Sequence, residues 1–270
     1  MLPVVSVLMA TYNDHPDRLW AALDSIVRQT CSDWELIVID DSTNGGTIEV
    51  LEEYAGKLPG QMVLVHNQVR RGFVASLNQG LALARGHFIA RMDGDDISEP
   101  HRLETQVKFM ESHPEIGIVG SHVLVIDENG APQSIRKYRC SHEEICARGY
   151  FRNPMAHPSV MLRRATFDLI GNYEFAHSED YELWLRAIKR SVRLSNIDEP
   201  LLRYRVVPAE SHKRNRSGGS KYVMRAKIRH FNWKYPVRSL LGICLSAIQW
   251  LMPQPMIDAL HARDAQKQIL

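Results

Sequence analysis

Apolar runs alternate with helix-spaced apolar residues through the first hundred positions of the chain. Short, nearly continuous apolar runs predict strands buried on both faces, at 4–11, 35–39, 62–66 and 87–92. Apolar residues three and four positions apart predict the helices between them, at 19–27, 47–55 and 73–84. Strands that alternate with helices imply right-handed crossovers and a mostly parallel sheet, so the expected class is α/β.

The pattern changes after about residue 100. A helix at 102–112 leads to an apolar strand at 116–126 and then to a turn signal, Glu128-Asn129-Gly130. The remaining predicted elements are helices at 142–150, 164–170 and 179–190 and a short strand at 159–162. From 211 to 257 there is no acidic residue, and a basic stretch at 213–238 is followed by an apolar helix at 240–252.

Polar side chains gather where the predicted strands end. The three clusters are Thr11-Tyr12-Asn13, Asp40-Asp41 and Asp93-Gly94-Asp95-Asp96. Ligands of open α/β sheets bind at the carboxyl ends of strands, so these clusters are candidates for one site. Three carboxylates within four residues repel one another unless a cation neutralises them, and hard oxygen ligands suit Mg²⁺ or Mn²⁺.

Each cluster taken singly has a plainer interpretation. Asp93 to Asp96 could be a solvated turn in which Asp96 caps the next helix, and Asp40-Asp41 could be an Asx turn or a cap. Asn13 or Asp14 could cap the helix that Pro16 begins. These alternatives stay open for each segment by itself.

Taken in order, the segments resemble the inverting family 2 glycosyltransferases of the GT-A fold. The matching stretches are ATYND, RQT before WEL, VIDDS, the small residues and Asn of 72–86, RMDGDD, GNYE and SEDYELWLR. The resemblance spans about residues 3–211. It implies a catalytic domain over 1–212, with a nucleotide-sugar half (1–100) and an acceptor half (101–212), and a tail over 213–270.

The resemblance also implies roles for individual residues. Asp41 would contact the base with Asp40 in support, beside Thr11, Tyr12 and Asn13. Asp95 and Asp96 would hold the metal–diphosphate, and Asp93 would face the ribose or the metal. Asp180 would be the catalytic base, assisted by Glu179, although acidic residues after Ser178 would also suit a helix start. His157, Trp184 and Arg205 would lie on the acceptor side.

One position departs from the family pattern. Many relatives end their last strand in Tyr-Arg-x-His, whereas Tyr204-Arg205-Val206 is followed here by Val207. Ser211 and His212 come a few residues later, which leaves the non-aspartate metal ligand open.

The resemblance therefore implies an inverting transferase that needs Mn²⁺ or Mg²⁺ and moves a sugar, most simply from a UDP-sugar, to a glycan or lipid-linked glycan. A catalytically inactive GT-A module is the main alternative. A sugar-1-phosphate nucleotidylyltransferase would need a glycine-rich loop that the turn at 11–15 lacks.

Composition and charge narrow the setting. The net charge is +2 and no nucleic-acid motif appears, so we expect no nucleic-acid partner. Four cysteines without a CxxC pair fit a reducing cytoplasmic location, and the spacing of Cys140, His142 and Cys146 matches no standard zinc site. The first residues read as a strand, not a signal peptide. The tail predicts either docking on an anionic membrane surface, at the cytoplasmic face of the inner membrane, or packing on the catalytic domain.

Overall fold

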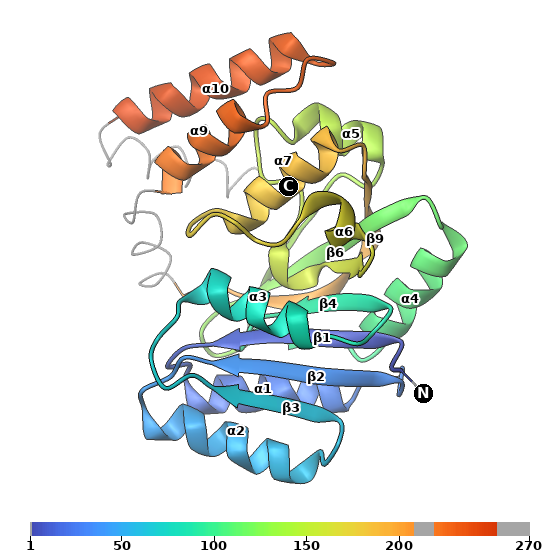
Figure 1. The fold of residues 1–270 in the computed structure, drawn as a ribbon, viewed down its shortest axis with the longest axis vertical. Coiled ribbons are helices and arrows are strands. Elements are labelled where there is room, and N and C mark those ends of the chain that lie inside the picture. The colour runs from blue at the N-terminus through green and yellow to red at the C-terminus, as the bar shows by residue number, and fades with distance from the viewer. Residues whose placement is uncertain (1, 208–218, 253–270) are drawn as a thin grey trace.

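The computed structural model of the chain describes residues 2–207 and 219–252 (Figure 1). Its centre is one sheet with the strand order β3-β2-β1-β4-β8-β6-β9-β5, and β7 pairs with β6 outside this path. The strands are β1 (Val5–Thr11), β2 (Trp34–Asp40), β3 (Met62–His66), β4 (Phe88–Met92), β5 (Ile97–Ser98), β6 (Ile116–Ile126), β7 (Pro132–Arg136), β8 (Met161–Arg163) and β9 (Arg193–Arg205).

Helices cover both faces of the sheet. They are α1 (Pro16–Val27), α2 (Gly45–Lys57), α3 (Phe73–Leu83), α4 (Arg102–Ser112), α5 (His142–Arg148), the 3₁₀ turn η1 (His157–Ser159), α6 (Thr166–Ile170), α7 (Glu179–Lys189), α9 (Gly219–Arg229) and α10 (Pro236–Leu251). One core cluster joins β1 to α1, α2 and α4. The other joins the opposite face to α3, α6 and α7, and Figure 1 shows α3 and α1 on opposite sides of β1 and β2.

The amino-terminal half has the parallel arrangement that the sequence predicts. β1 pairs in parallel with both β2 and β4, and β2 with β3. Thr11 lies opposite Asp40 in the register, and Met9 lies opposite Met92. The loops after these strands therefore leave the sheet at one edge. In the second half β8 runs antiparallel to β4 and β6, while β6 and β9 run parallel.

Several predicted helix starts are wrong in detail. His15, not Asn13 or Asp14, is the N-cap of α1, and no side chain caps it. Asn44 caps α2 by accepting a hydrogen bond from the Thr47 N–H, which leaves Asp40 and Asp41 for other contacts. The N-cap of α4 is His101, so Asp96 does not cap that helix. The predicted strand at 159–162 is a 3₁₀ turn followed by β8.

The carboxyl-terminal helices α9 and α10 pack against each other and against the preceding part of the chain. The Tyr150 hydroxyl donates to the His230 carbonyl at 2.6 Å, and the Lys227 ammonium donates to the Gly242 carbonyl at 3.1 Å. Tyr181 and Leu185 of α7 share a small buried cluster with Ala226 of α9. In the part of the chain that the structure describes, no helix combines the length and apolar character needed to cross a membrane.

Candidate active site

The acidic loop after β4 gathers three carboxylates around one point. Ligand oxygens of Asp93, Asp95 and Asp96 all lie within 4.8 Å of one another. Asp96 is 1% exposed; its Oδ1 accepts the Arg205 N–H at 2.8 Å, while Oδ2 has no hydrogen-bond partner among the described residues. Burial, then the charges of Asp93 and Asp95, raises the pKa of Asp96 well above its ordinary value. A buried oxygen without a donor beside two more carboxylates fits a divalent cation.

Asp14 adds a fourth carboxylate that sequence reasoning assigned to a cap. A Cβ on Gly94 would lie 2.5 Å from Asp14 Oδ2, so this carboxylate lies directly against the acidic loop. Burial raises the pKa of Asp14 to about 7, with added contributions from Asp95, Asp93 and Asp40. The signal that would have found it is its position at the carboxyl end of β1.

Asp40 binds the ends of three strands together. Its Oδ1 accepts the Thr11 hydroxyl at 2.8 Å and the Ser42 N–H at 3.0 Å, and its Oδ2 lies 2.9 Å from His66 Nδ1. Asp40 and Thr11 are both buried. Their side chains therefore shape the edge of the sheet.

Asp41 organises the loop that leads into α3. Its Oδ1 accepts from Asn67 Nδ2 at 2.8 Å, and its Oδ2 accepts the N–H groups of Arg71 at 3.1 Å and Gly72 at 2.7 Å. Burial alone would raise the pKa of Asp41, but these hydrogen bonds outweigh it and hold the pKa below its ordinary value. Gly72 has φ 88°, a backbone region that favours glycine.

The turn after β1 presents an aromatic ring at the same edge. Tyr12 is 42% exposed, and the Arg70 guanidinium carbon lies 3.9 Å from its ring centroid. Asn13, at φ 53°, accepts hydrogen bonds from the N–H groups of Thr43 at 2.8 Å and Asn44 at 3.1 Å. The Asn13 side chain thus joins the loops after β1 and β2 and leaves the Tyr12 ring at the surface.

The candidate base lies in the first turn of α7. Asp180 Oδ2 accepts from Asn153 Nδ2 at 2.6 Å, and Oδ1 accepts from the Tyr181 N–H at 2.6 Å. Burial raises the pKa of Asp180, and burial followed by the charge of Asp180 raises the pKa of Glu179 to about 7. Ser178 is the N-cap of α7, as expected, but it lies at φ 56° and its side chain makes no capping hydrogen bond.

Arg91 connects this pair to the acidic loop, and sequence reasoning did not single it out. It is 2% exposed within β4 and forms an ion pair with Asp93. Its Nε and Nη1 atoms have no hydrogen-bond partner among the described residues. Burial raises the pKa values of Glu179 and Asp180, and the positive charge of Arg91 offsets part of that rise. Arg91 therefore lies within electrostatic reach of both carboxylates. A lone arginine inside an apolar strand was the available signal.

His157 lies between Glu179 and the core. Its Nε2 is 2.9 Å from the Tyr173 hydroxyl oxygen, and its Nδ1 is 3.8 Å from Glu179 Oε1. Burial, with a contribution from Arg91, lowers the pKa of His157 well below its ordinary value, so the ring is neutral at pH 7. Trp184 is 0% exposed and packs edge-on against that ring, with centroids 6.0 Å apart. Trp184 therefore does not take the expected place on the acceptor side. It is buried against the His157 ring and supports that ring.

Arg205 also differs from its expected acceptor role. Its Nε donates to the Asp95 carbonyl at 2.8 Å, and its Nη1 donates to the carbonyls of Asp127 at 2.9 Å and Glu128 at 3.0 Å. The guanidinium thus holds the acidic loop against the turn after β6. Val207 follows at the end of this strand, and Ser211 and His212 lie outside the described residues.

Comparisons with known proteins bear on the family and the fold of the chain. The profile of Glycosyl transferase family 2 matches residues 6–170. The putative glycosyltransferase EpsE of Bacillus subtilis is 30% identical over 98% of this chain and 96% of its own length. The UDP-Gal:alpha-D-GlcNAc-diphosphoundecaprenol beta-1,3-galactosyltransferase of Escherichia coli is 30% identical over 82% of this chain and 80% of its own.

Solved structures show the same fold. The Staphylococcus aureus TarS 1-349 structure in complex with UDP-GlcNAc aligns with a TM-score of 0.67 at 20% identity, over 88% of this chain and 70% of that one. Against a longer TarS structure the TM-score is 0.63, and the aligned part is 39% of that chain. The expected GT-A type fold is confirmed by this likeness. With the family profile spanning residues 6–170, more than half of the chain, and with EpsE alignable almost end to end, the chain belongs to glycosyltransferase family 2.

Proposed function

We propose that the chain is an inverting, metal-dependent glycosyltransferase that moves a sugar from a UDP-sugar to a hydroxyl of a glycan or lipid-linked glycan. The observation that carries the proposal is that one buried arginine, Arg91, serves two acidic clusters. It forms an ion pair with Asp93, whose ligand oxygen lies within 4.8 Å of those of Asp95 and Asp96, and its charge acts on Glu179 and Asp180. A donor diphosphate and a base on opposite sides of one carbon are what in-line displacement requires.

The donor side supplies binding and charge compensation. Asp95 and Asp96, with Asp93, would hold Mn²⁺ or Mg²⁺, which neutralises the charge that develops on a departing diphosphate. Asp41 and the exposed Tyr12 ring are proposed to flank the base of the nucleotide, with Asp40, Thr11 and Asn13 fixing their loops. The choice of UDP is supported by the UDP-GlcNAc complex of TarS, whose fold is similar.

The acceptor side supplies the proton acceptor. The acceptor hydroxyl gives its proton to the Asp180 carboxylate while its oxygen forms a bond to the anomeric carbon. The bond from that carbon to the diphosphate oxygen breaks on the opposite face, so the configuration inverts and UDP leaves. Asn153 holds Asp180 in place through the 2.6 Å hydrogen bond.

Asp180→Asn tests the base. Transfer should fall by about 10² to 10⁴, the usual contribution of a general base, while calorimetric UDP–Mn²⁺ affinity stays within about twofold. Asp168→Asn, an exposed aspartate in the first turn of α6, is the matched control and should leave both unchanged. Undiminished turnover in Asp180→Asn would remove Asp180 from the mechanism. Equal UDP affinity with and without Mn²⁺ in the unaltered protein would remove the metal.

We further propose that α10 docks on an anionic membrane surface. Its buried positions include the small residues Ser239, Gly242 and Ser246, whereas seven of its large apolar side chains are 48% to 76% exposed. These are Val237, Leu240, Leu241, Leu245, Ile248, Trp250 and Leu251. An exposed apolar face of this size is typical of an interaction surface, and the basic Lys234 and Arg238 near its start favour anionic lipid.

A vesicle assay tests this docking. The full chain should sediment with vesicles containing anionic phosphatidylglycerol and much less with phosphatidylcholine vesicles. The double variant Leu241→Glu, Ile248→Glu should stay in the supernatant with unchanged UDP affinity. A variant that still sediments, or a native chain that sediments equally with both vesicle types, would refute lipid docking, as would a stable dimer that buries the same face.

A further inference from the structure

A cleft of about 820 Å³ opens beside the candidate base, and the donor side described above does not use it. Its walls are the end of β7 with the segment that follows, helix α5, and the loop from α5 to η1. Asn153 lines the cleft and also donates the 2.6 Å hydrogen bond to Asp180. Tyr138 lines it too, and the charge of Asp180 contributes to raising the pKa of Tyr138. The cleft therefore comes within one side chain, that of Asn153, of the carboxylate that would take the acceptor's proton.

The cleft is strongly basic. The described residues that line it include five basic side chains, Arg136, Lys137, Arg139, Arg148 and Arg152. Its two acidic residues, Glu144 and Asp198, each have a partner. Glu144 Oε1 accepts from Arg139 Nη1 at 3.3 Å, and Asp198 Oδ1 lies 2.9 Å from His122 Nε2. Positive charge concentrated in a concave site favours an anionic ligand.

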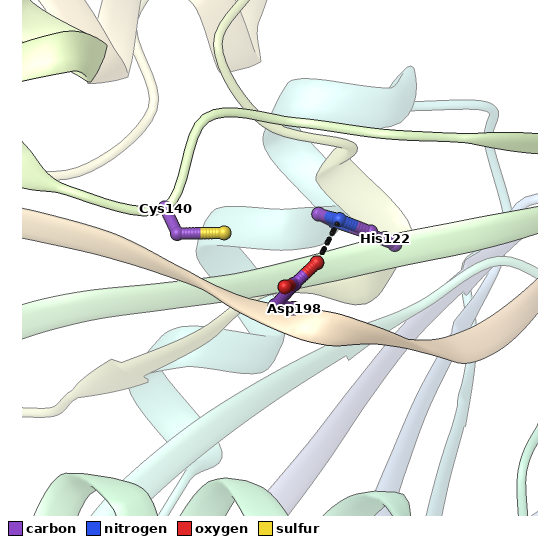
Figure 2. Close-up of side chains that lie close together, drawn as sticks. All are labelled: His122, Cys140 and Asp198. Atoms are coloured by element: carbon purple, nitrogen blue, oxygen red, sulfur yellow. Dashed lines mark ion pairs between the residues drawn. The ribbon is translucent and has the colours of Figure 1, made fainter.

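Figure 2 shows that Cys140, His122 and Asp198 lie together in this cleft. The Tyr138 N–H donates to His122 Nδ1 at 3.4 Å, so the neutral ring carries its proton on Nε2 and donates it to Asp198. Burial raises the pKa of the Cys140 thiol, which favours its protonated form. The three residues therefore suit a hydrogen-bonded wall of the cleft better than a metal centre. The Asp198 carboxylate is engaged in the contact with His122.

We propose that this cleft binds a phosphate or diphosphate group that is covalently attached to the acceptor saccharide, beside the hydroxyl that Asp180 deprotonates. The inference rests on the proposed transferase function and narrows its acceptor to a phosphate-bearing one. Arginine forks bind phosphate oxygens in a bidentate manner, and three arginines of the wall, Arg139, Arg148 and Arg152, are exposed. A cleft of about 820 Å³ has room for a saccharide with its phosphates.

The cleft also adjoins the carboxyl-terminal helices. Tyr150 lies in sequence between Arg148 and Arg152 and is fully buried beneath α10, where a Cβ on Gly242 would come 2.4 Å from the Tyr150 carbonyl oxygen. The wall that carries the two arginines is therefore packed against the helix whose apolar face is exposed. A lipid-linked diphosphate sugar would meet basic side chains and an apolar surface on adjacent elements.

Binding to the full chain, saturated with UDP and Mn²⁺ so that the donor site is occupied, tests the proposal. Calorimetry would compare three probes: an N-acetylglucosamine diphosphate ester of a short alkyl alcohol, a glycosyl phosphodiester oligomer, and neutral octyl N-acetylglucosaminide. Arg139→Gln, Arg148→Gln should weaken the diphosphate ester by about tenfold or more and change the neutral glycoside by less than about twofold. The exposed pair Arg164→Gln, Arg190→Gln removes the same charge elsewhere and should change neither.

The outcomes separate the two proposals. A preference for the diphosphate ester or for the phosphodiester oligomer identifies which source supplies the phosphate, and either preference must be lost in the cleft variant. Equal binding of charged and neutral probes by the native chain, or equal losses in the cleft and control pairs, overturns the inference. Unchanged UDP–Mn²⁺ affinity in the cleft variant shows that it folds. Failure of the native chain to transfer any sugar, with phosphate selectivity intact, would refute the transferase function alone.

Discussion

Arg91→Met would remove a cation that forms an ion pair with Asp93 and acts on the Glu179–Asp180 pair, while keeping a side chain of similar length. Because the Arg91 charge lowers the pKa values of Glu179 and Asp180, its loss should raise both. The base acts as a carboxylate, so activity is lost as pH falls through the pKa of the pair. The acid limb of kcat/KM should therefore move to higher pH, with a larger loss at pH 6 than at pH 8.5.

The stability of this variant should change little, for a reason visible in the structure. Arg91 and Asp93 are 3% and 29% exposed, so the cost of breaking their ion pair falls between a surface and a buried pair, at about 2 kcal/mol. Against this, the Nε and Nη1 atoms of Arg91 are buried without a hydrogen-bond partner among the described residues. Removing them restores about 2 kcal/mol to the free energy of unfolding. The two effects nearly cancel, and Tm should shift by no more than about 4 °C.

Arg102→Met is the matched control because Arg102 is a second fully buried arginine. Its Nη2 donates to the Arg91 carbonyl at 2.7 Å and its Nε to Gln106 Oε1 at 3.1 Å, so its removal leaves buried acceptors unpaired. We expect a loss of about 3 kcal/mol in the free energy of unfolding and an unmoved acid limb. The assay is sugar transfer across pH 5.5–9 with saturating Mn²⁺, alongside thermal melting. Superimposable pH profiles for Arg91→Met and the native enzyme would refute the role given to Arg91.

Three further predictions concern the scaffold of the site. Arg205→Lys replaces a guanidinium that bridges two loops with a single ammonium donor. Metal-dependent UDP affinity, measured by calorimetry, should therefore fall by about tenfold. Unchanged affinity would mean that the acidic loop holds its shape without the guanidinium. Asp41→Asn places an amide against backbone N–H donors and should cost about 1–3 kcal/mol in urea unfolding, with weaker UDP binding. Gly242→Ala brings a Cβ within 2.4 Å of the Tyr150 carbonyl oxygen and should lower Tm. Gly56→Ala, at a helical position with no atom within 4 Å of the added Cβ, should raise the free energy of unfolding by about 1 kcal/mol. Opposite signs for the two alanines are the result to look for, and a stabilising Gly242→Ala would contradict the described packing of α10.

Local pattern accounts for much of the fold. Strands β3 and β6 and helix α4 begin and end where their apolar patterns do, at 62–66, 116–126 and 102–112. Three strands have no predicted counterpart. The apolar residues of β9 are interrupted at Asp198-Glu199-Pro200, and β5 and β7 are short and carry no apolar run. Their pairing to β9 and β6 depends on partners far along the chain, which no window of sequence contains.

By itself the sequence determined that the acidic loop follows a buried strand and that polar residues follow its parallel neighbours, because chain direction fixes which edge of a parallel sheet receives those loops. Tertiary structure decided what each side chain does there. The arginine expected at the acceptor, Arg205, binds carbonyls 77 to 110 residues away, and Trp184 is buried behind His157. Asp14 and Arg91 joined the site because folding placed their charges among other carboxylates. Such contacts arise from packing in three dimensions, and no spacing along the chain encodes them.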